Sequence, residues 1–349
     1  MKKKLHCFFL NLPLVFPLVV FIALITFPVL LSCNKRKTNE NTTSKQLIIW
    51  TYDSFVSEWG PGPEISGVFE KKTGIEINWV SHGDAVEILS RLLYEGKDSN
   101  ADLILGLDQN MTSRALLSGL FEAYKPKDSE KIFRELISNE DFRLIPFDYS
   151  YFAIVYDSEK VLIPPKNLED LTDPRFRESI ILIDPRTSSP GLGFFGWVKE
   201  VYGSLWQDYW LRLKPSILTI PEGWSSAYGL FTRGEAPLVL SYMTSPGYHL
   251  EYEDSERYKA AIFTDGHPMQ IEKAGLLGAA KNKENAKIFL DFMISADFQE
   301  IIPLTNWMYP VIDIPLPASF RINSKSGKTL IPDPVTEDDL NNWASLMIK

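Results

Sequence analysis

The sequence predicts an α/β protein that is organised in two domains. Strand-like and helix-like segments alternate from residue 47 to about residue 242, which is typical of βαβ units and of a mainly parallel sheet. An extended aromatic run at residues 145–156 interrupts this alternation near its middle. The chain has 349 residues, of which 45% are hydrophobic, and this is enough apolar surface for two domains of ordinary size.

The elements before the aromatic run follow from local pattern. Runs rich in β-branched residues and leucine predict strands, and segments with apolar residues on one face predict helices. The helix at 63–72 ends at Gly74 in a Lys-Lys-Thr-Gly stop signal. The strands are expected at residues 47–52, 75–80 and 101–107, and the helices at 63–72, 86–94 and 111–118.

The same alternation returns after the aromatic run. We expect strands at 179–183, near 217–220 and at 237–242, and helices at 190–202 and 224–233. The aromatic run itself is interpreted as a first crossing between two lobes. A return crossing is expected after residues 258–263, because residues 286–295 again have the pattern of a surface helix.

The N-terminus has the pattern of an export signal. Three lysines precede residues 8–32, which carry no charge, and polar sequence follows directly after Cys33. The segment Leu30-Leu31-Ser32-Cys33 also resembles a bacterial lipobox, in which the cysteine is lipidated and becomes the first mature residue. An uncleaved membrane anchor and chance similarity are the alternatives, although three prolines and Asn11 make a poor spanning helix.

These patterns give a domain organisation. Residues 1–32 are predicted to be a lipoprotein signal peptide, and 33–46 a polar tether that holds the body off a membrane. The first lobe is expected at 47–146, with a return segment at about 264–305. The second is expected at 147–263, with a C-terminal segment at about 306–349.

Composition excludes several classes of protein. The formal net charge is −9 and no long basic block is present, which argues against nucleic-acid binding. Export would remove Cys7 and lipidate Cys33, leaving no thiol for a disulfide, a metal or catalysis. The common hydrolase, P-loop and zinc motifs are missing, and the histidines lack metal-ligand spacing. Gly191 to Gly196 match GxGxxG, but the strand and acid of a dinucleotide site are not at the required spacing.

Three helix starts are candidate anion sites. Asp84 precedes a helix, with Glu87 three residues later, as in a capping box. Ser189-Pro190 and Ser245-Pro246 each follow a predicted strand, with serine at the N-cap. In open α/β sheets such helix N-termini face the ligand crevice and favour anions. The alternative is that these residues only cap their helices.

Aromatic residues near predicted loops and strand ends are the second candidate feature. Trp59, Trp224 and Trp307 lie in polar, loop-like sequence, and Tyr52, Tyr242 and Tyr248 flank strand ends. Such rings suit a flat cationic ligand in an acidic protein, although they could instead fill the core. Asp53 and Asp84 are the nearest acids, and either could bind an amino group or act as a cap.

Taken in order, several segments between residue 47 and about residue 320 resemble the thiamine-binding proteins of bacterial ABC importers. The tail after about residue 325 matches poorly, and the lipobox departs from the ordinary cleaved signal of many relatives. The resemblance implies the type II periplasmic-binding-protein fold, with a ligand cleft between two α/β lobes. The matching segments are 51–55, 59–63, 101–108, 146–149, 184–193, 223–225, 240–246 and 306–310.

The resemblance also implies ligand contacts. A phosphate end would lie at Asp84-Ala85, Ser188-Ser189 and the segment from Tyr242 to Ser245, and Ala85 stands where some relatives have glycine. The thiazolium and pyrimidine rings would contact aromatic residues, with Asp53 nearby. The implied ligand-binding residues are Tyr52, Asp53, Trp59, Asp84, Ala85, Ser188, Ser189, Trp224, Tyr242, Met243, Thr244, Ser245, Tyr248 and Trp307.

The expected function is that of a lipid-anchored, exported, monomeric substrate-binding subunit, without catalysis, metal or cofactor. It would carry thiamine, thiamine monophosphate or thiamine diphosphate to an ABC permease and its ATPase. Three alternatives stay open. The same fold could bind a polyamine, a ferric ion or another phosphorylated molecule, although Tyr242 and Tyr248 are not the adjacent pair that iron requires. The chain could be a secreted thiamine-modifying enzyme, or a sensory or adhesive surface lipoprotein.

Overall fold

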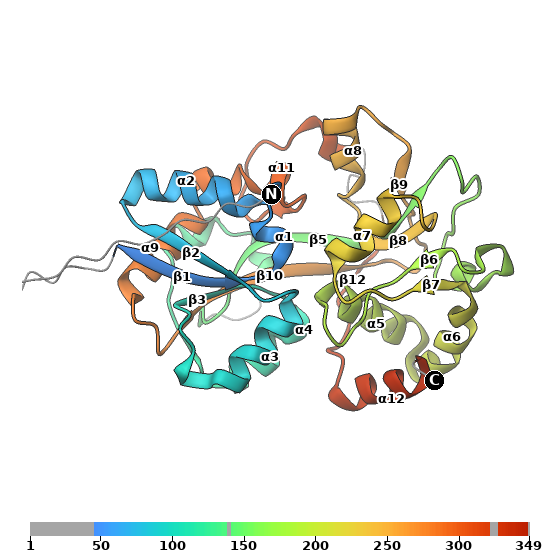
Figure 1. Cartoon of the computed structure of the whole chain (residues 1–349), viewed down its shortest axis with the longest axis horizontal. Coiled ribbons are helices and arrows are strands. Elements are labelled where there is room, and N and C mark those ends of the chain that lie inside the picture. Colours follow the sequence, from blue (N-terminus) through green and yellow to red (C-terminus); the bar gives the residue numbers. More distant parts are fainter. Residues whose placement is uncertain (1–44, 138–140, 322–326, 348–349) are drawn as a thin grey trace, which may run out of the picture. The chain divides into compact units, whose positions relative to one another are not determined.

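The computed structural model describes residues 45–137, 141–321 and 327–347. The predicted signal peptide, Cys33 and nearly all of the predicted tether lie outside the described residues. Within the described part, no helix has both the length and the apolar character that crossing a membrane requires. Figure 1 shows helices packed around a sheet whose long central strands, β5 and β10, run through both lobes of the body.

One twelve-stranded sheet organises the body, and its main path runs β2-β1-β3-β10-β5-β8-β6-β7. Short strands β4, β9, β11 and β12 pair with β10 or β5 beside this path. The strands are β1 Gln46–Thr51, β2 Glu76–Ser81, β3 Leu103–Leu107, β4 Phe121–Glu122, β5 Ile145–Asp157, β6 Ile180–Ile181, β7 Ile217–Thr219, β8 Leu238–Tyr242, β9 Tyr258–Ala260, β10 His267–Leu277, β11 Tyr309–Pro310 and β12 Thr329–Leu330.

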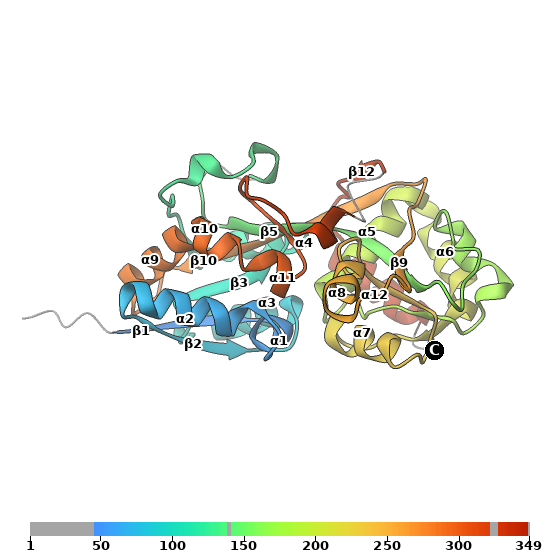
Figure 2. The same ribbon diagram turned by 90° about the horizontal axis from the view of Figure 1, so that it is seen from above.

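Helices cover the two halves of this sheet, and short 3₁₀ turns join several of the elements (Figure 2). Capping explains several of their ends: Asp84 and Glu87 form the predicted capping box, and Gly74 ends α2 with φ 71°. The helices are α1 Asp53–Val56, α2 Pro61–Thr73, α3 Ala85–Glu95, α4 Gln109–Leu117, α5 Ser189–Tyr202, α6 Trp206–Leu213, α7 Trp224–Thr232, α8 Pro246–Glu253, α9 Lys283–Met293, α10 Ala296–Gln299, α11 Ile302–Thr305 and α12 Glu337–Met347.

The predicted elements are confirmed, but the predicted mainly parallel sheet is only partly correct. Strands β1, β2 and β3 pair in parallel, as do β6, β7 and β8. The centre is antiparallel, because β10 pairs antiparallel with β3 and β5, and β5 pairs antiparallel with β8. Two long strands that cross between the lobes in opposite directions therefore separate two parallel βαβ regions.

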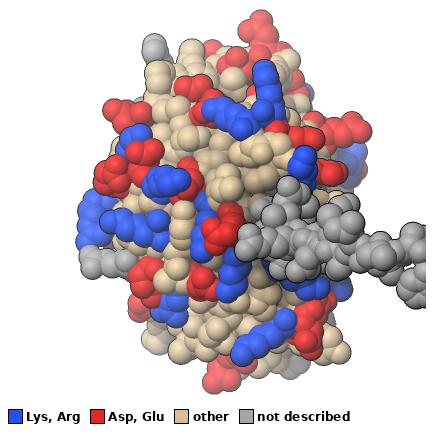
Figure 3. All heavy atoms as spheres, turned by 90° about the vertical axis from the view of Figure 1, so that its left-hand side faces the viewer, with Lys and Arg blue, Asp and Glu red and all other residues tan. Residues whose placement is uncertain are grey.

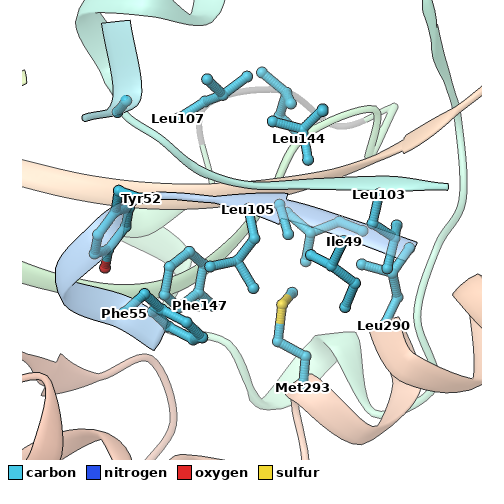
Figure 4. Packing of buried hydrophobic residues seen from close by; sticks show 14 of the residues in the cluster. Ile49, Tyr52, Phe55, Leu103, Leu105, Leu107, Leu144, Phe147, Leu290 and Met293 are labelled. Carbon is cyan, nitrogen blue, oxygen red and sulfur yellow. The ribbon is translucent and has the colours of Figure 1, made fainter. Parts of the chain in front are cut away.

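Each lobe has its own apolar core. Figure 4 shows part of the first core, where Ile49, Leu103 and Leu105 from the strands meet Leu290 and Met293 of α9. The second core is rich in aromatic side chains from α5 and α6. Strand β5 contributes to both cores, with Phe147 in the first and Phe152 in the second. The two cores thus share strand β5.

The C-terminal part divides between the lobes, which corrects the predicted boundary at residue 306. Met308, Val311 and Phe320 pack in the first core, because β11 pairs with the part of β5 that lies in that lobe. Leu330 and Trp343 pack in the second core. The helices α6 and α12 were not among the predicted elements.

Charges of both signs are mixed on the surface of the first lobe that Figure 3 shows. The first lobe also has exposed ion pairs, such as Lys72 with Asp297 and Lys287 with Glu284. Exposed pairs of this kind contribute little to stability. Although the net charge of the chain is −9, this face of the first lobe does not form one continuous acidic patch.

Candidate functional site

A cavity of about 330 Å³ lies between the two lobes, next to the crossing strands. Cavities of this size hold small organic molecules. Residues of both lobes form its walls, so a bound molecule would touch both at once. The residues that line it are Tyr52, Ser54, Trp59, Asp84, Ser189, Pro190, Trp224, Ser225, Tyr228, Gly229, Thr232, Tyr242, Ser245, Tyr248, Glu272, Thr305, Asn306, Trp307 and Met308.

Stacked aromatic rings form one wall of the cavity. The rings of Trp224 and Tyr228, one turn apart on α7, are 5.0 Å apart and inclined by 16°. Trp59, from the first lobe, lies 6.2 Å from Trp224 and is 53% exposed. The Trp224 ring is held in place because its Nε1 donates a hydrogen bond of 2.9 Å to Ser241 Oγ. This wall offers flat faces to an aromatic or cationic ring.

A chain of hydrogen bonds fixes Tyr228 from behind. Its hydroxyl lies 2.9 Å from His249 Nε2, and His249 Nδ1 lies 2.7 Å from Glu253 Oε2. His249 is completely buried, and burial lowers the pKa of its ring. Burial likewise raises the pKa of the Tyr228 hydroxyl. The neutral imidazole therefore positions the tyrosine ring on which Trp224 stacks.

Trp307 forms another part of the wall and has an unusual backbone. Its φ is 57°, in the left-handed region that bulky residues rarely adopt. The ring stacks on Phe320 at 6.0 Å and meets Tyr248 edge-on at 5.7 Å. A Cβ added at Gly247 would lie 3.2 Å from the Trp307 ring, so glycine at that position leaves room for the tryptophan. The strained backbone is held by packing on both sides.

The carboxylate of Asp84 joins the lobes at the N-termini of helices. It caps α3, where Oδ1 accepts 2.6 Å from the Ala85 N–H. From the second lobe, the Ser188 hydroxyl donates to Oδ2 at 2.7 Å and the Ser189 N–H to Oδ1 at 3.1 Å. The Trp224 N–H at the start of α7 approaches Oδ2 at 3.5 Å. Two of the three helix starts that the sequence suggested for an anion, those of α3 and α5, therefore hold one of the protein's own carboxylates.

Burial raises the pKa of Asp84, and these donors partly oppose the rise. The remaining negative charge is met by peptide dipoles of α3, α5 and α7. A ligand phosphate that reached these N–H groups would have to share them with Asp84. The arrangement works as a bridge that holds the lobes together across the cavity.

A pair of acids lies beneath the cavity, on the crossing strands. Glu272 on β10 and Asp148 on β5 are directly opposite each other in the strand register. Tyr52 Oη donates to Glu272 Oε2 at 2.6 Å, and Gln270 Nε2 donates to Oε1 at 3.1 Å. Asn306 Nδ2 donates to Asp148 Oδ2 at 2.7 Å. Only Glu272 of the two acids lines the cavity.

Both carboxyls of this pair are shifted toward the protonated form. Burial raises the pKa of Asp148 to about 8. The pKa of Glu272 is raised well above its usual range, first by burial and then by the neighbouring Asp148. Tyr52, which bonds Glu272, also has a raised pKa, because it is buried beside acids. The floor of the cavity is thus an acidic network without a neighbouring cation among its hydrogen-bond partners.

The charges on the cavity walls have one sign. Asp84 and Glu272 are its acids, and no lysine, arginine or histidine is among the residues that line it. In the described ranges, no group of three or more side chains is placed to hold a metal ion. The combination of aromatic faces with acids suits a flat, positively charged organic molecule.

Most of the predicted ligand-binding residues meet at this cavity, although they come from segments far apart in the chain. They are held by the residues on either side of α1, the start of α3, α5, α7, the end of β8, α8 and the segment after α11. The predicted residues that line it are Tyr52, Trp59, Asp84, Ser189, Trp224, Tyr242, Ser245, Tyr248 and Trp307.

Other predicted residues are not on its walls. Asp53 accepts a hydrogen bond of 3.1 Å from the Ser225 hydroxyl, which is a further contact between the lobes. The Ala85 N–H and the Ser188 hydroxyl are both used by Asp84. These groups support the site from behind instead of facing its centre.

Met243 and Thr244, which were predicted at the ligand, are buried next to β5 and are not among the residues that line the cavity. The Met243 N–H donates to the Tyr151 carbonyl at 2.9 Å, and Thr244 Oγ1 lies 3.0 Å from Ser150 Oγ. Their side chains are 1% and 4% exposed. The reason is the tight turn after β8, where the Ser245 N–H bonds to the Tyr242 carbonyl and only the ends of the segment face the cavity.

Several residues of the cavity were not among the predicted ligand-binding residues. Glu272 is a charged residue within a strand that is otherwise largely buried, and that contrast could have indicated it. Tyr228 lies one helical turn after Trp224, and Asn306 directly precedes Trp307, so both share a predicted neighbourhood. The residues missed are Ser54, Pro190, Ser225, Tyr228, Gly229, Thr232, Glu272, Thr305, Asn306 and Met308.

Comparison with known proteins finds close relatives. The family described as bacterial extracellular solute-binding protein matches residues 98–332. The thiamine-binding periplasmic protein of Brucella abortus biovar 1 (strain 9-941) is 47% identical over 292 residues, which are 83% of this chain and 86% of the relative. The protein of that name from Escherichia coli (strain K12) is 44% identical, covering 81% and 86%.

A solved structure described as a periplasmic thiamin binding protein has the same architecture. It matches with a TM-score of 0.83 at 41% sequence identity. The match covers 86% of this chain and 96% of the solved one. The similarity therefore extends over both lobes and the cavity between them.

Proposed function

Because the chain belongs to the bacterial extracellular solute-binding proteins, with their type II periplasmic-binding-protein fold, we propose that it binds thiamine between its lobes and delivers it to an ABC importer. Relatives that are named for thiamine binding cover most of the chain at 44% to 47% identity. The observation in the structure that carries the proposal is the cavity between the lobes, with aromatic walls and acids but no basic lining residue.

The chemistry of thiamine fits this cavity group by group. Its thiazolium ring is a permanent cation and its aminopyrimidine is flat, so the wall of Trp224 and Tyr228 offers both a stacking surface. Glu272 supplies a carboxyl for the positive charge. The hydroxyl and amide groups of Tyr52, Tyr242 and Asn306 can bond the polar atoms of the pyrimidine.

Thiamine monophosphate and thiamine diphosphate are the alternative ligands. The N–H groups of Ala85 and Ser189 are donors of the kind that hold phosphate, but here they hold Asp84. A phosphate would bind there only where Asp84 gave up some of these bonds or was protonated. We expect all three forms to be distinguishable by affinity for this reason.

Export, membrane anchoring and the partners in transport are also part of the proposed function. We propose that residues 1–32 direct export, that Cys33 carries lipid, and that the body works as a monomer on the outer face of a membrane. The partners would be a permease and, through it, an ATPase, with no catalytic step, cofactor or nucleic acid. The names of the relatives support a periplasmic binding role. Mass spectrometry of the purified protein would detect a diacylated Cys33 as the first residue.

Calorimetric titration with thiamine and its two phosphates tests the proposed ligand. We expect nanomolar binding of at least one form, on the order of −11 kcal/mol. Spermidine and ferric citrate serve as controls for the polyamine and iron alternatives. Dissociation constants above millimolar for every thiamine form would refute the proposal. Recovery of intact thiamine after incubation distinguishes binding from a thiamine-modifying activity.

A further inference from the structure

We propose that Glu272, paired with Asp148, is the residue that recognises the positive charge of the ligand, and that this pair gives up a shared proton when the cation binds. The inference deepens the proposed function, because it rests on a cationic ligand in the cavity. It makes the pair a determinant of specificity, and it makes binding depend on pH in a defined direction.

The strand register brings the two acids together. Residues directly opposite on an antiparallel pair have Cβ atoms only about 5 Å apart on the same face, and like charges there are unfavourable. Asp148 and Glu272 occupy such positions on β5 and β10. Asp148 is completely buried and Glu272 is 5% exposed, so water screens their repulsion poorly. Two full negative charges are therefore unfavourable at this position.

The hydrogen bonds around the pair leave a place for one proton. Both oxygens of Glu272 accept hydrogen bonds, from Tyr52 and from Gln270. On Asp148, Oδ2 accepts from Asn306, whereas Oδ1 is buried and has no partner among the described residues. An unpaired buried carboxylate oxygen is costly. A proton held by the pair removes one negative charge and gives this oxygen a hydrogen-bonding role.

The groups that face Glu272 do not supply a counter-charge. Asp84, Asp108 and Asp148 all act on it as acids, and Tyr52 is a neutral phenol with a raised pKa. Tyr242, also a neutral phenol with a raised pKa, donates its hydroxyl hydrogen to Gln270 and not to the acids.

Lys273 follows on the same strand, but its ammonium is used elsewhere. Its Nζ donates 2.8 Å to Thr112 Oγ1 on α4 and interacts with Asp108. Burial lowers the pKa of Lys273 to about 8. None of these neighbouring side chains places a positive charge beside Glu272, so a cationic ligand can supply it.

The protonation state of Asp148 and Glu272 follows from these acidic, buried surroundings. With the cavity empty, the pair keeps at least one proton at neutral pH, because the pKa of Asp148 is about 8 and that of Glu272 is raised well above its usual range. A cation next to Glu272 favours the ionised form, so the pair releases the proton when the ligand binds. Affinity then rises as pH increases toward 8, by up to about tenfold per pH unit for one proton.

Calorimetry with thiamine tests this directly. Titrations of the purified protein at pH 6, 7 and 8, each in two buffers with different ionisation enthalpies, give the affinity and the number of protons released. We expect close to one proton released per thiamine at pH 7. The dissociation constant should fall several-fold from pH 6 to pH 7.5.

Two variants assign the effect to the pair. Glu272→Gln should weaken thiamine binding by about ten- to a hundredfold, and it should abolish most of the proton release. Asp148→Asn removes the repulsion, so Glu272 ionises more readily in the empty protein. Burial, the larger cause of the Glu272 shift, remains, so we expect Asp148→Asn to release fewer protons than the parent protein at the same pH and to bind at pH 6 no more weakly.

His249→Gln is the matched control. Protonation of His249 at low pH would also put positive charge near the site, with the same sign of pH dependence, and His249 lies behind Tyr228 and not at the acids. The control should retain the proton release. Thermal melting shows which variants fold, and should Glu272→Gln fail to fold, Asp148→Asn decides alone.

The outcomes separate this inference from the proposed function. Tight thiamine binding without proton release, or an unchanged pH slope in Asp148→Asn, would overturn the role of the pair and leave the proposed function intact. Loss of the slope in His249→Gln would assign the proton to the histidine and also overturn it. Failure of thiamine to bind at every pH would refute the proposed function, and the inference with it.

Discussion

Asp84 and Glu272 line the same cavity, and burial raises the pKa of both, yet their neighbours differ. Asp84 accepts N–H bonds at the starts of helices and a serine hydroxyl from the opposite lobe. Glu272 accepts hydrogen bonds from the Tyr52 phenol and the Gln270 amide, and it lies opposite another acid, Asp148. Burial alone therefore does not assign a role to either carboxyl. Peptide dipoles make one carboxylate a bridge between lobes, whereas the other lacks a positive partner until a ligand arrives.

The largest effect that would test this contrast is the pH dependence of stability without ligand. A carboxyl whose pKa is raised on folding keeps a proton that the unfolded chain loses. Stability is therefore lost as pH rises, by up to about 1.4 kcal/mol per pH unit for each proton. For Asp148 the window runs from its ordinary pKa of 3.8 to about 8. We expect the melting temperature of the empty protein to fall by several degrees from pH 5.5 to pH 8.

Asp148→Asn is the comparison that isolates this effect, because buried histidines with lowered pKa contribute the opposite sign at low pH. The variant should show a flatter dependence of melting temperature on pH than the parent protein. Identical slopes in the two proteins would show that Asp148 contributes no proton to the pair. Saturating thiamine should flatten the slope of the parent in the same direction.

The next largest effect concerns the bridge. Asp84→Ala removes the cap of α3 and the acceptor for Ser188, Ser189 and Trp224, so closing the lobes becomes less favourable. We expect thiamine affinity to fall by about a hundredfold and the cap loss to cost about 1 kcal/mol of stability. Calorimetry and melting curves measure the two effects.

Asp53→Asn is the matched control for the bridge, because Asp53 makes only an exposed contact with Ser225 across the lobes. It should change affinity no more than about threefold. Equal losses in Asp53→Asn and Asp84→Ala would mean that helix N-termini give Asp84 no special role. Thiamine monophosphate should lose less affinity than thiamine in Asp84→Ala, since the N–H donors become free for phosphate.

The smallest effect comes from the aromatic wall. Trp224→Ala removes the ring that stacks on Tyr228 but retains the backbone N–H near Asp84. We expect at least a tenfold loss of thiamine affinity with the pH slope unchanged. Trp59→Ala, at a position that is 53% exposed, should lose less. Unchanged binding by Trp224→Ala would show that this ring only packs against its neighbours and does not contact the ligand.

Local features of the fold could be predicted from the sequence. The Asp84 and Glu87 spacing gave the capping box correctly, and Gly74 correctly ended α2. Cross-strand geometry could not be predicted in the same way. Asp148 and Glu272 are 124 positions apart, and only the antiparallel register of β5 and β10 places them opposite each other. The local sequence of the aromatic run at residues 145–156 does not show which strand will pair with it.

The site was predicted in part for the same reason. Trp59, Trp224 and Trp307 lie in polar sequence and do line the cavity, since that contrast is visible locally. Met243 and Thr244 belong to a predicted segment, but the turn after β8 buries them against β5. Which side of a turn faces a cavity depends on the element packed behind it, and this information lies elsewhere in the chain.

The long strands β5 and β10 connect the two lobes and also carry Asp148 and Glu272. The register of the pair shifts between Glu272 and Lys273, directly beside the acids. Bending at this point as the lobes separate would change the spacing of the carboxyls and admit water to them. Release of the ligand and return of the proton to the acid pair would then occur in the same movement. Because proton uptake accompanies ligand release under the proposed role of the pair, acidic surroundings would favour the empty protein over the loaded one.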